Sequence, residues 1–188
     1  MALRFVVSAG AATDSPKDIV PDSPKDRVAG RITLRACDPL RDGEFIRSES
    51  RENFFTVIDS SIGWDEQRHC KEPECPEQYR IVMVGEARIG FFRLVESTTT
   101  TPAGSTARLL SISTIQLIAG ARNQGIGTQL LVGIEAHARS TNVRALRPRV
   151  FHGNPAKKLY RRLGFHEVES DEHSSTLEKP LFDRSSQR

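Results

Sequence analysis

A short loop between two apolar stretches carries the clearest chemical signal in the sequence. The stretch before it, residues 109–118, is apolar and rich in β-branched residues, which predicts a buried strand. The loop reads Arg122-Asn123-Gln124-Gly125-Ile126-Gly127, and apolar residues at helical spacing begin at Ile126. A strand that runs through a glycine loop into a helix points free backbone N–H groups and the positive end of a helix dipole at one place. The sequence therefore predicts an anion site here, with a phosphate group as the expected ligand.

Two familiar phosphate-binding motifs do not fit this loop. Gly120 and Gly125 have the spacing of the P-loop glycines, but Ile126 and Gly127 stand where that motif needs lysine and serine or threonine. The dinucleotide-binding fingerprint needs a third glycine three residues after Gly127, and Leu130 is found there. The pattern that remains is Arg-x-x-Gly-x-Gly at the end of a strand.

A second stretch with chemical content lies about thirty residues downstream. It reads Asn154-Pro155-Ala156-Lys157-Lys158-Leu159-Tyr160-Arg161-Arg162-Leu163-Gly164-Phe165. Asparagine is a good helix N-cap, proline is tolerated at the first helical position, and Gly164 fits a C-terminal cap. We therefore expect a short helix with Tyr160 on its apolar face, where the tyrosine is either a core aromatic or a reactive hydroxyl.

The rest of the chain predicts the elements that position these two stretches. Strands are expected at 31–37, 79–84, 88–96, 144–151, 165–169 and 174–178, with one or two helices at 39–60 broken near Asn53 and a helix at 125–140. Residues 97–107 are expected to be a polar loop. We expect residues 31–182 to form one domain, with a flexible extension at 1–30 and a polar tail at 183–188.

Composition narrows the classes of partner. The chain has 188 residues and a net charge of +3, and no apolar run approaches the length of about 20 residues that spans a membrane. Seven basic residues lie between Arg144 and Gly164 without an acidic one, but no aromatic platform accompanies them. We therefore expect neither a membrane nor a nucleic-acid partner.

The cysteines predict a reducing compartment and no metal site. There are three, an odd number without paired spacing, which favours free thiols and a cytoplasmic protein. His69, Cys70 and Cys75 are close together in the sequence but match no common zinc spacing, so no metal is expected.

Together, the Arg-x-x-Gly-x-Gly loop and the Asn-Pro-Ala-x-x-Leu-Tyr-x-x-Leu-Gly-Phe stretch resemble the GNAT superfamily of N-acetyltransferases, over about residues 31–182. The resemblance implies an α/β (α+β) domain with a mixed, mostly antiparallel sheet, splayed fourth and fifth strands, and flanking helices. It implies acetyl-CoA as cosubstrate without a metal, and direct transfer of the acetyl group in a ternary complex to a primary amine, either a small molecule or a protein amino group. The alternative is a module of this fold that senses acyl-CoA without catalysis. Homodimers are common in the family, so a dimer is compatible with the resemblance.

The resemblance also assigns cofactor-binding residues. Backbone groups of Leu117 and Ala119 would pair with the pantetheine arm as an added strand. The pyrophosphate would be held by the Arg122 side chain and by the backbone N–H groups of Gln124, Gly125, Ile126, Gly127 and Thr128. Asn154 would contact the pantetheine, cap its helix, or do both. Lys157 or Lys158 could reach the adenosine 3′-phosphate, or form a solvated basic face.

The catalytic assignments are Tyr160 and Gln116. Tyr160 stands where the family usually has the general acid that protonates the leaving thiolate. Many members carry a carboxylate base on the central strand, but residues 109–117 contain none. Gln116 or Ser111 could position a water molecule, or a carboxylate from elsewhere, such as Glu52, Glu86 or Glu96, could act as the base. The identity of the base and of the acetyl acceptor stays open.

Overall fold

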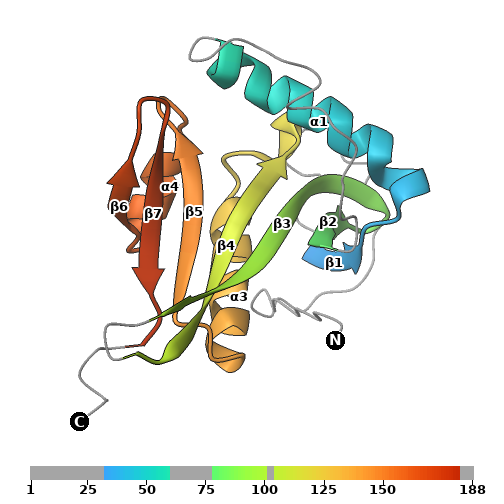
Figure 1. Ribbon diagram of the computed structural model, residues 1–188. Coiled ribbons are helices and arrows are strands. Elements are labelled where there is room, and N and C mark those ends of the chain that lie inside the picture. The colour runs from blue at the N-terminus through green and yellow to red at the C-terminus, as the bar shows by residue number, and fades with distance from the viewer. Residues whose placement is uncertain (1–31, 60–77, 101–103, 183–188) are drawn as a thin grey trace.

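The computed structural model describes residues 32–59, 78–100 and 104–182, which form one α/β domain around a seven-stranded sheet (Figure 1). The elements in chain order are β1 (Ile32–Ala36), α1 (Pro39–Asp59), β2 (Tyr79–Val84), β3 (Ala87–Thr100), β4 (Thr106–Leu117), the 3-10 helix η3 (Ala119–Ala121), α3 (Ile126–Ser140), β5 (Ala145–Phe151), α4 (Ala156–Arg162), β6 (His166–Ser170) and β7 (Ser174–Pro180). The expected extension, the tail and the set His69, Cys70 and Cys75 lie outside the described residues.

The sheet is mixed and mostly antiparallel, which confirms the expected fold class. Its strand order is β1-β2-β3-β4-β5-β7-β6, and β4 and β5 form the one parallel pair among the described strands. None of the described helices combines the length and the apolar character that a membrane crossing needs.

Two expected boundaries are wrong. α1 is one continuous helix through Asn53, because the Asn53 side chain hydrogen-bonds to Gln116 of β4 and so does not compete for the helix backbone. Much of the expected loop at 97–107 is strand. Residues Ser97 to Thr100 pair with Leu109 to Thr106, since threonine is β-branched and pairs well across strands.

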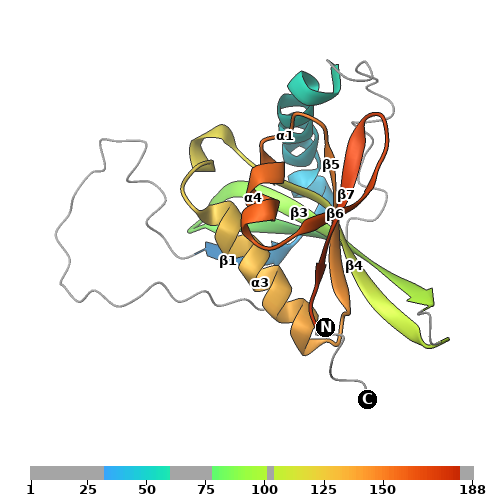
Figure 2. The same ribbon diagram turned by 90° about the vertical axis from the view of Figure 1, so that its left-hand side faces the viewer.

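The sheet separates two unequal apolar cores. The larger lies on the face that α3 and α4 cover, and includes Phe92, Leu110, Leu131 and Tyr160 (Figure 2). The smaller lies on the other face, where Ile46 of α1 packs with Ile81 and Phe91. Among the side chains that the structure describes, polar contacts of α1 accompany this smaller apolar core.

Near Ser113, β4 loses its pairing with β5, and the side chains that follow point to the opposite faces of the sheet. The parallel ladder with β5 runs only from Leu109 to Ile112, and its last pair is Ile112 with Pro148. Proline has no N–H to donate, so the ladder ends there and the two strands diverge. On the other side, Arg93 pairs with Thr114 and Leu94 with Ile112, which leaves Ser113 as a bulge. The predicted splay of the fourth and fifth strands is thus confirmed.

The bulge decides which side chains face α1. Leu110 and Ile112 belong to the core on the α3 face, and after the bulge Ile115 and Leu117 pack against that same core. Thr114 and Gln116 are therefore turned to the α1 face, which is the way β-bulges re-aim side chains. Without the extra residue, Gln116 would point into the apolar α3 core.

A buried carboxylate fixes the start of α1. Asp42 is 0% exposed and accepts two hydrogen bonds from Arg35 of β1, at 2.6 and 2.7 Å, and a longer one of 3.4 Å from Arg88 of β3. Its Oδ2 also accepts the Asp38 backbone N–H at 2.9 Å, while the Asp38 side chain accepts the Leu40 N–H at 3.0 Å. The helix is thereby both capped and tied to two strands. These bonds, the one from Arg35 first, lower the pKa of Asp42.

Replacing Asp42 with Asn should destabilise the domain by about 2 kcal/mol or more at pH 7, because the amide cannot accept both Arg35 bonds. A folded-state pKa below the unfolded value contributes stability above pH of about 4, which is lost as the pH falls further. The deficit of D42N should therefore shrink in acid. Denaturant unfolding measures both effects.

The matched control for that experiment is Asp38→Asn, since asparagine caps a helix as well as aspartate does. Its free energy of unfolding should stay within about 0.5 kcal/mol of the wild type. A D42N protein as stable as D38N at pH 7 would contradict the anchoring role of Asp42.

Candidate functional site

The Arg122–Gly127 loop connects β4 to α3 and has the backbone shape of an anion site. Asn123 has φ +60° and Gly125 has φ +80°, so the chain makes two left-handed turns before the helix begins at Ile126. An L side chain at Gly125 would be strained by about 1–2 kcal/mol. The Gln129 N–H is the first to bond back into the helix, to the Gly125 carbonyl at 3.0 Å. The N–H groups from Ile126 to Thr128 form the first helical turn, which lacks intrahelical acceptors.

The second predicted stretch packs directly against this loop. A Cβ at Gly127 would lie 3.1 Å from Leu159 Cδ2, so the missing side chain allows α4 to approach the first turn of α3. Asn154 caps α4, because its Oδ1 accepts the Ala156 N–H at 2.9 Å, as the sequence predicted. The two motifs, thirty residues apart in the chain, therefore lie next to each other in the fold.

Tyr160 lies on the buried face of α4. It is 3% exposed, and its ring packs edge-on against Phe165 with the centroids 5.2 Å apart. No described residue forms a hydrogen bond with its hydroxyl group. Burial raises the pKa of Tyr160 well above its usual value. The hydroxyl therefore stays protonated at neutral pH and is available as a proton donor.

The two lysines of α4 differ in their contacts. Lys157 Nζ lies 2.8 Å from the Glu167 carboxylate of β6 and 2.8 Å from Ser175 Oγ of β7. These contacts direct it to the closing strands. Lys158 is exposed.

A chain of polar side chains joins α1 to the end of β4 and to the loop. Asn53 Nδ2 donates to Gln116 Oε1 at 3.0 Å, and Gln116 Nε2 donates to Thr114 Oγ1 at 3.1 Å. Arg122 donates to Asn53 Oδ1, and through its Nε to the Leu117 carbonyl at 3.0 Å. Gln116, which is 6% exposed, is thus satisfied by neutral groups on both sides of its amide. The structure brings Gln116, Leu117 and Arg122 together.

The candidate bases that the sequence suggested are scattered. Glu96 pairs with Arg108 at 2.7 Å, and Glu86 is exposed in the turn between β2 and β3. Glu52 is exposed on α1, and Ser111 precedes the bulge. None of these four is among the hydrogen-bonded groups around Gln116 and Arg122 in the described part of the chain.

Sequence reasoning missed one carboxylate close to that network. Glu49 lies on α1 one turn before Asn53, and its Oε2 is buried with no hydrogen-bond partner. Burial first, and then the charge of Glu52, raise the pKa of Glu49, while the positive charge of Arg122 opposes them. The signal was present in the spacing: Ile46, Glu49 and Asn53 follow one another by three and four residues, which places them on one helix face.

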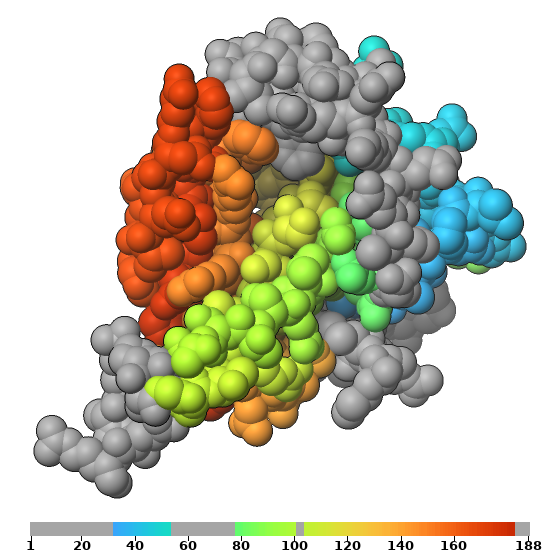
Figure 3. Space-filling model, in the orientation of Figure 1, coloured from blue at the N-terminus to red at the C-terminus, as the bar shows by residue number. Residues whose placement is uncertain are grey.

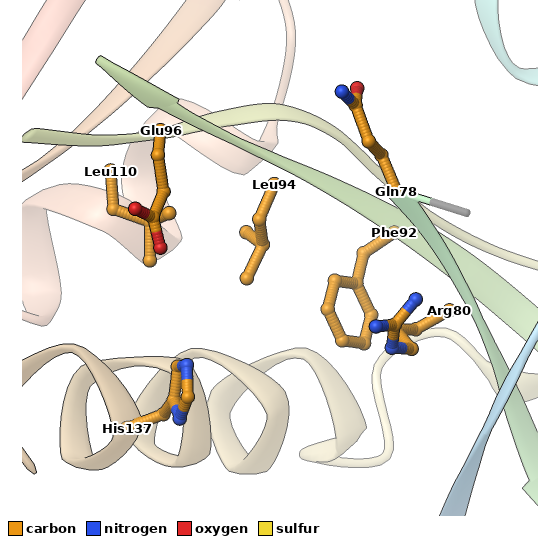
Figure 4. A pocket seen from close by; sticks show the side chains of 7 residues that line it. All are labelled: Gln78, Arg80, Phe92, Leu94, Glu96, Leu110 and His137. Carbon is orange, nitrogen blue, oxygen red and sulfur yellow. The ribbon is translucent and has the colours of Figure 1, made fainter. Parts of the chain in front are cut away.

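A separate cavity of about 220 Å³ lies on the opposite face of the sheet, over α3 (Figure 4). Phe92, Leu94 and Leu110 point from the strands toward the helix, and His137 points up from it. The other lining residues are Gln78, Arg80 and Glu96. Of the residues that the sequence suggested for the site, the cavity contains only Glu96, one of the candidate bases. Figure 3 shows a hollow in the surface between β4 and β5. It lies where these two strands diverge, beyond their last paired residues.

Comparisons with known proteins agree with this geometry. Residues 77–167 match the family model of an acetyltransferase (GNAT) domain. No curated protein sequence matches the chain. Among solved structures, the PaiA N-acetyltransferase of Thermoplasma acidophilum in complex with coenzyme A has 16% identity and a TM-score of 0.63, and the match covers 79% of this chain and 98% of that one.

Two solved structures of Arabidopsis thaliana NAA60 are also similar to this chain. The complex with a bisubstrate analogue has 18% identity and a TM-score of 0.61, over 80% of this chain and 99% of that one. The complex with acetyl-CoA has 17% identity and a TM-score of 0.59, over 79% and 99%. These likenesses show the fold.

Proposed function

We propose that this chain, a member of the GNAT superfamily of acetyltransferases, transfers the acetyl group of acetyl-CoA to a primary amine of a small molecule or a protein. The observation that carries the proposal is the left-handed backbone of the Arg122–Gly127 loop, which follows the part of β4 that has left β5. A long ligand that carries phosphates at one end can place them on the loop and its thioester between the diverging strands β4 and β5. Acetyl-CoA has that shape, and similar structures hold CoA or acetyl-CoA.

The donor site follows from the backbone. The free N–H groups of Gln124 to Thr128 are the donors for the pyrophosphate, and Arg122 adds a charge-assisted contact. β4 beyond Ile112 has no β5 partner, so its edge near Leu117 can pair with the amides of the pantetheine arm, alongside the bond that the Leu117 carbonyl accepts from Arg122 Nε. Asn154, whose Oδ1 caps α4, keeps its amide Nδ2 for the same arm.

The chemistry is aminolysis of a thioester. A neutral amine attacks the carbonyl carbon, a tetrahedral oxyanion forms, and the C–S bond breaks as the thiolate leaves. We assign Tyr160 as the acid that protonates the thiolate, because its hydroxyl is protonated and lies on the helix that packs against the loop. Gln116 is assigned as a positioning residue, since its amide is fixed between Thr114 and Asn53.

Acetyl-CoA should raise the unfolding midpoint by about 5–10 °C at 100 times its dissociation constant, since a ligand that binds only the folded state adds about 2.7 kcal/mol. ATP, which lacks the pantetheine arm, should have much less effect. Gly125→Ala should lose most of the acetyl-CoA shift because its φ of +80° is unfavourable for alanine. Differential scanning fluorimetry measures each shift.

Gly120→Ala is the control for the loop, because a Cβ at Gly120 meets no atom within 4 Å. Its acetyl-CoA shift should equal that of the wild type. If acetyl-CoA produces no shift in the wild-type protein at millimolar concentration, the proposed function is wrong.

Tyr160→Phe should lower kcat by about 10²-fold or more while the dissociation constant for acetyl-CoA stays within about twofold. The phenyl ring keeps the packing against Phe165, so only the proton donor is lost. Because its pKa is raised, Tyr160 should cause no loss of activity in the wild type up to pH of about 10. Release of free CoA, measured with a panel of diamines and peptides with free N-termini, gives the rate.

Tyr79→Phe is the matched control, since Tyr79 packs against Phe91 on the α1 side of the sheet and belongs to neither motif. Equal turnover in Y160F, Y79F and the wild type would remove the acid role from Tyr160. Acetyl-CoA binding without CoA release for any amine would favour the non-catalytic sensing module.

A further inference from the structure

We propose that Glu49 of α1 is the group that accepts the proton of the attacking amine. The inference rests on the proposed function. It names a proton acceptor that β4 does not provide, since this strand carries no carboxylate. Three observations support it: the position of Glu49 on α1, the missing hydrogen-bond partner of its Oε2, and the charges around it.

α1 holds Glu49 toward the end of β4 because the helix is fixed on both sides of it. Asp42, Ile46, Glu49 and Asn53 follow at intervals of four, three and four residues, so they form one stripe along the helix. Asp42 ties the first turn to Arg35, and Ile46 is buried against the sheet. Asn53 hydrogen-bonds to Gln116 and Arg122. Glu49 lies about 6 Å along the axis from Asn53, on the same inward face.

One carboxylate oxygen of Glu49 lacks a hydrogen-bond partner within the protein, as expected of a group that binds a ligand. Oε2 is the one buried side-chain nitrogen or oxygen in the described residues that has no hydrogen-bond partner. Burying a carboxylate oxygen without a partner costs free energy, and native proteins seldom do so without a functional reason. An ammonium or amine N–H of a bound substrate would supply the missing partner.

Within the described part of the chain, the charges that act on Glu49 come from two elements. Glu52 is on its own helix and Arg122 is on the loop after β4. Burial and Glu52 move the pKa of Glu49 upward, toward the pH at which the enzyme works, which makes a carboxylate a better proton acceptor. The positive charge of Arg122 opposes this upward shift of the pKa. The charge of Arg122 acts on Glu49, which places Glu49 near the side chain that we assign to the pyrophosphate.

The protons balance in the following way. An alkylammonium, R–NH₃⁺, gives one proton to Glu49 and becomes the neutral nucleophile. Its nitrogen forms the C–N bond, the C–S bond breaks, and the nitrogen loses a second proton to solvent. Tyr160 gives its proton to the leaving thiolate and is reprotonated from solvent. Glu49 then releases its proton, so the net products are the amide, CoA and one H⁺.

The test compares Glu49→Gln with the wild type in acetylation of an alkyl diamine and of a peptide with a free N-terminus. At pH 7 the variant should lose about 10²-fold or more in kcat/KM. Because the amine must then lose its proton in solution, the variant should recover about tenfold per pH unit toward the pKa of the amine, which is about 10.4 for the alkyl diamine and about 8 for the peptide N-terminus. With hydroxylamine, which is already neutral at pH 7, the variant and the wild type should differ by less than about threefold.

Glu44→Gln is the control, because Glu44 is exposed on α1 five residues before Glu49 and lies outside the stripe. It should leave all rates unchanged. The acetyl-CoA dissociation constant of E49Q should not rise, whereas it would rise if Glu49 served only to hold Arg122. A loss confined to KM, with an unchanged pH profile, would make Glu49 a binding group for the ammonium and overturn the proton-acceptor role.

Failure of the inference and failure of the proposed function give different results. If wild-type protein releases CoA with the amine probes and E49Q does so equally well at pH 7, only the role of Glu49 is wrong. If wild-type protein neither binds acetyl-CoA nor releases CoA with any probe, including hydroxylamine, both proposals are wrong.

Discussion

The site depends on a change in β4 that takes place within two residues. At Ile112 the strand loses its parallel partner, because Pro148 of β5 has no N–H to continue the ladder. At Ser113 a bulge turns the following side chains over, so that Gln116 faces α1 while Leu117 stays with the α3 core. The first event exposes a free strand edge, and the second places polar side chains beside it. Both are needed for a ligand to enter the sheet and meet reactive groups there.

The remaining elements hold groups against that opening. α3 begins at the loop after β4 and supplies its unpaired N–H groups, while Gly127 lets α4 approach with Tyr160. On the other face, the described part of α1 packs Ile46 into a small apolar core and is tied by polar bonds at Asp42 and at Asn53. The proposed acid therefore comes from the α3 and α4 face of the sheet and the proposed base from the α1 face. This separation keeps Tyr160 protonated and leaves Glu49 ionisable.

The parts of the site that the sequence predicted are those determined by local residues. The cap at Asn154 and the helix that begins at Ile126 each depend on residues within a few positions, and both are confirmed. The break at Asn53 was wrong because the partner of its side chain, Gln116, is 63 residues away. Glu49 was missed because its neighbour Arg122 comes from another element. The bulge had a local signal, since the apolar residues change phase between Ile112 and Ile115.

In the proposed function, the Arg122–Gly127 loop and the following helical turn bind the phosphates of acyl-CoA. The most direct measurement is a titration of ¹⁵N-labelled protein with CoA, followed by amide chemical shifts. The account predicts that the largest shifts occur at the backbone amides of Gln124 to Thr128 and at Ala119, and that residues around the cavity near His137 move little. Large shifts at that cavity with an unperturbed loop would contradict it.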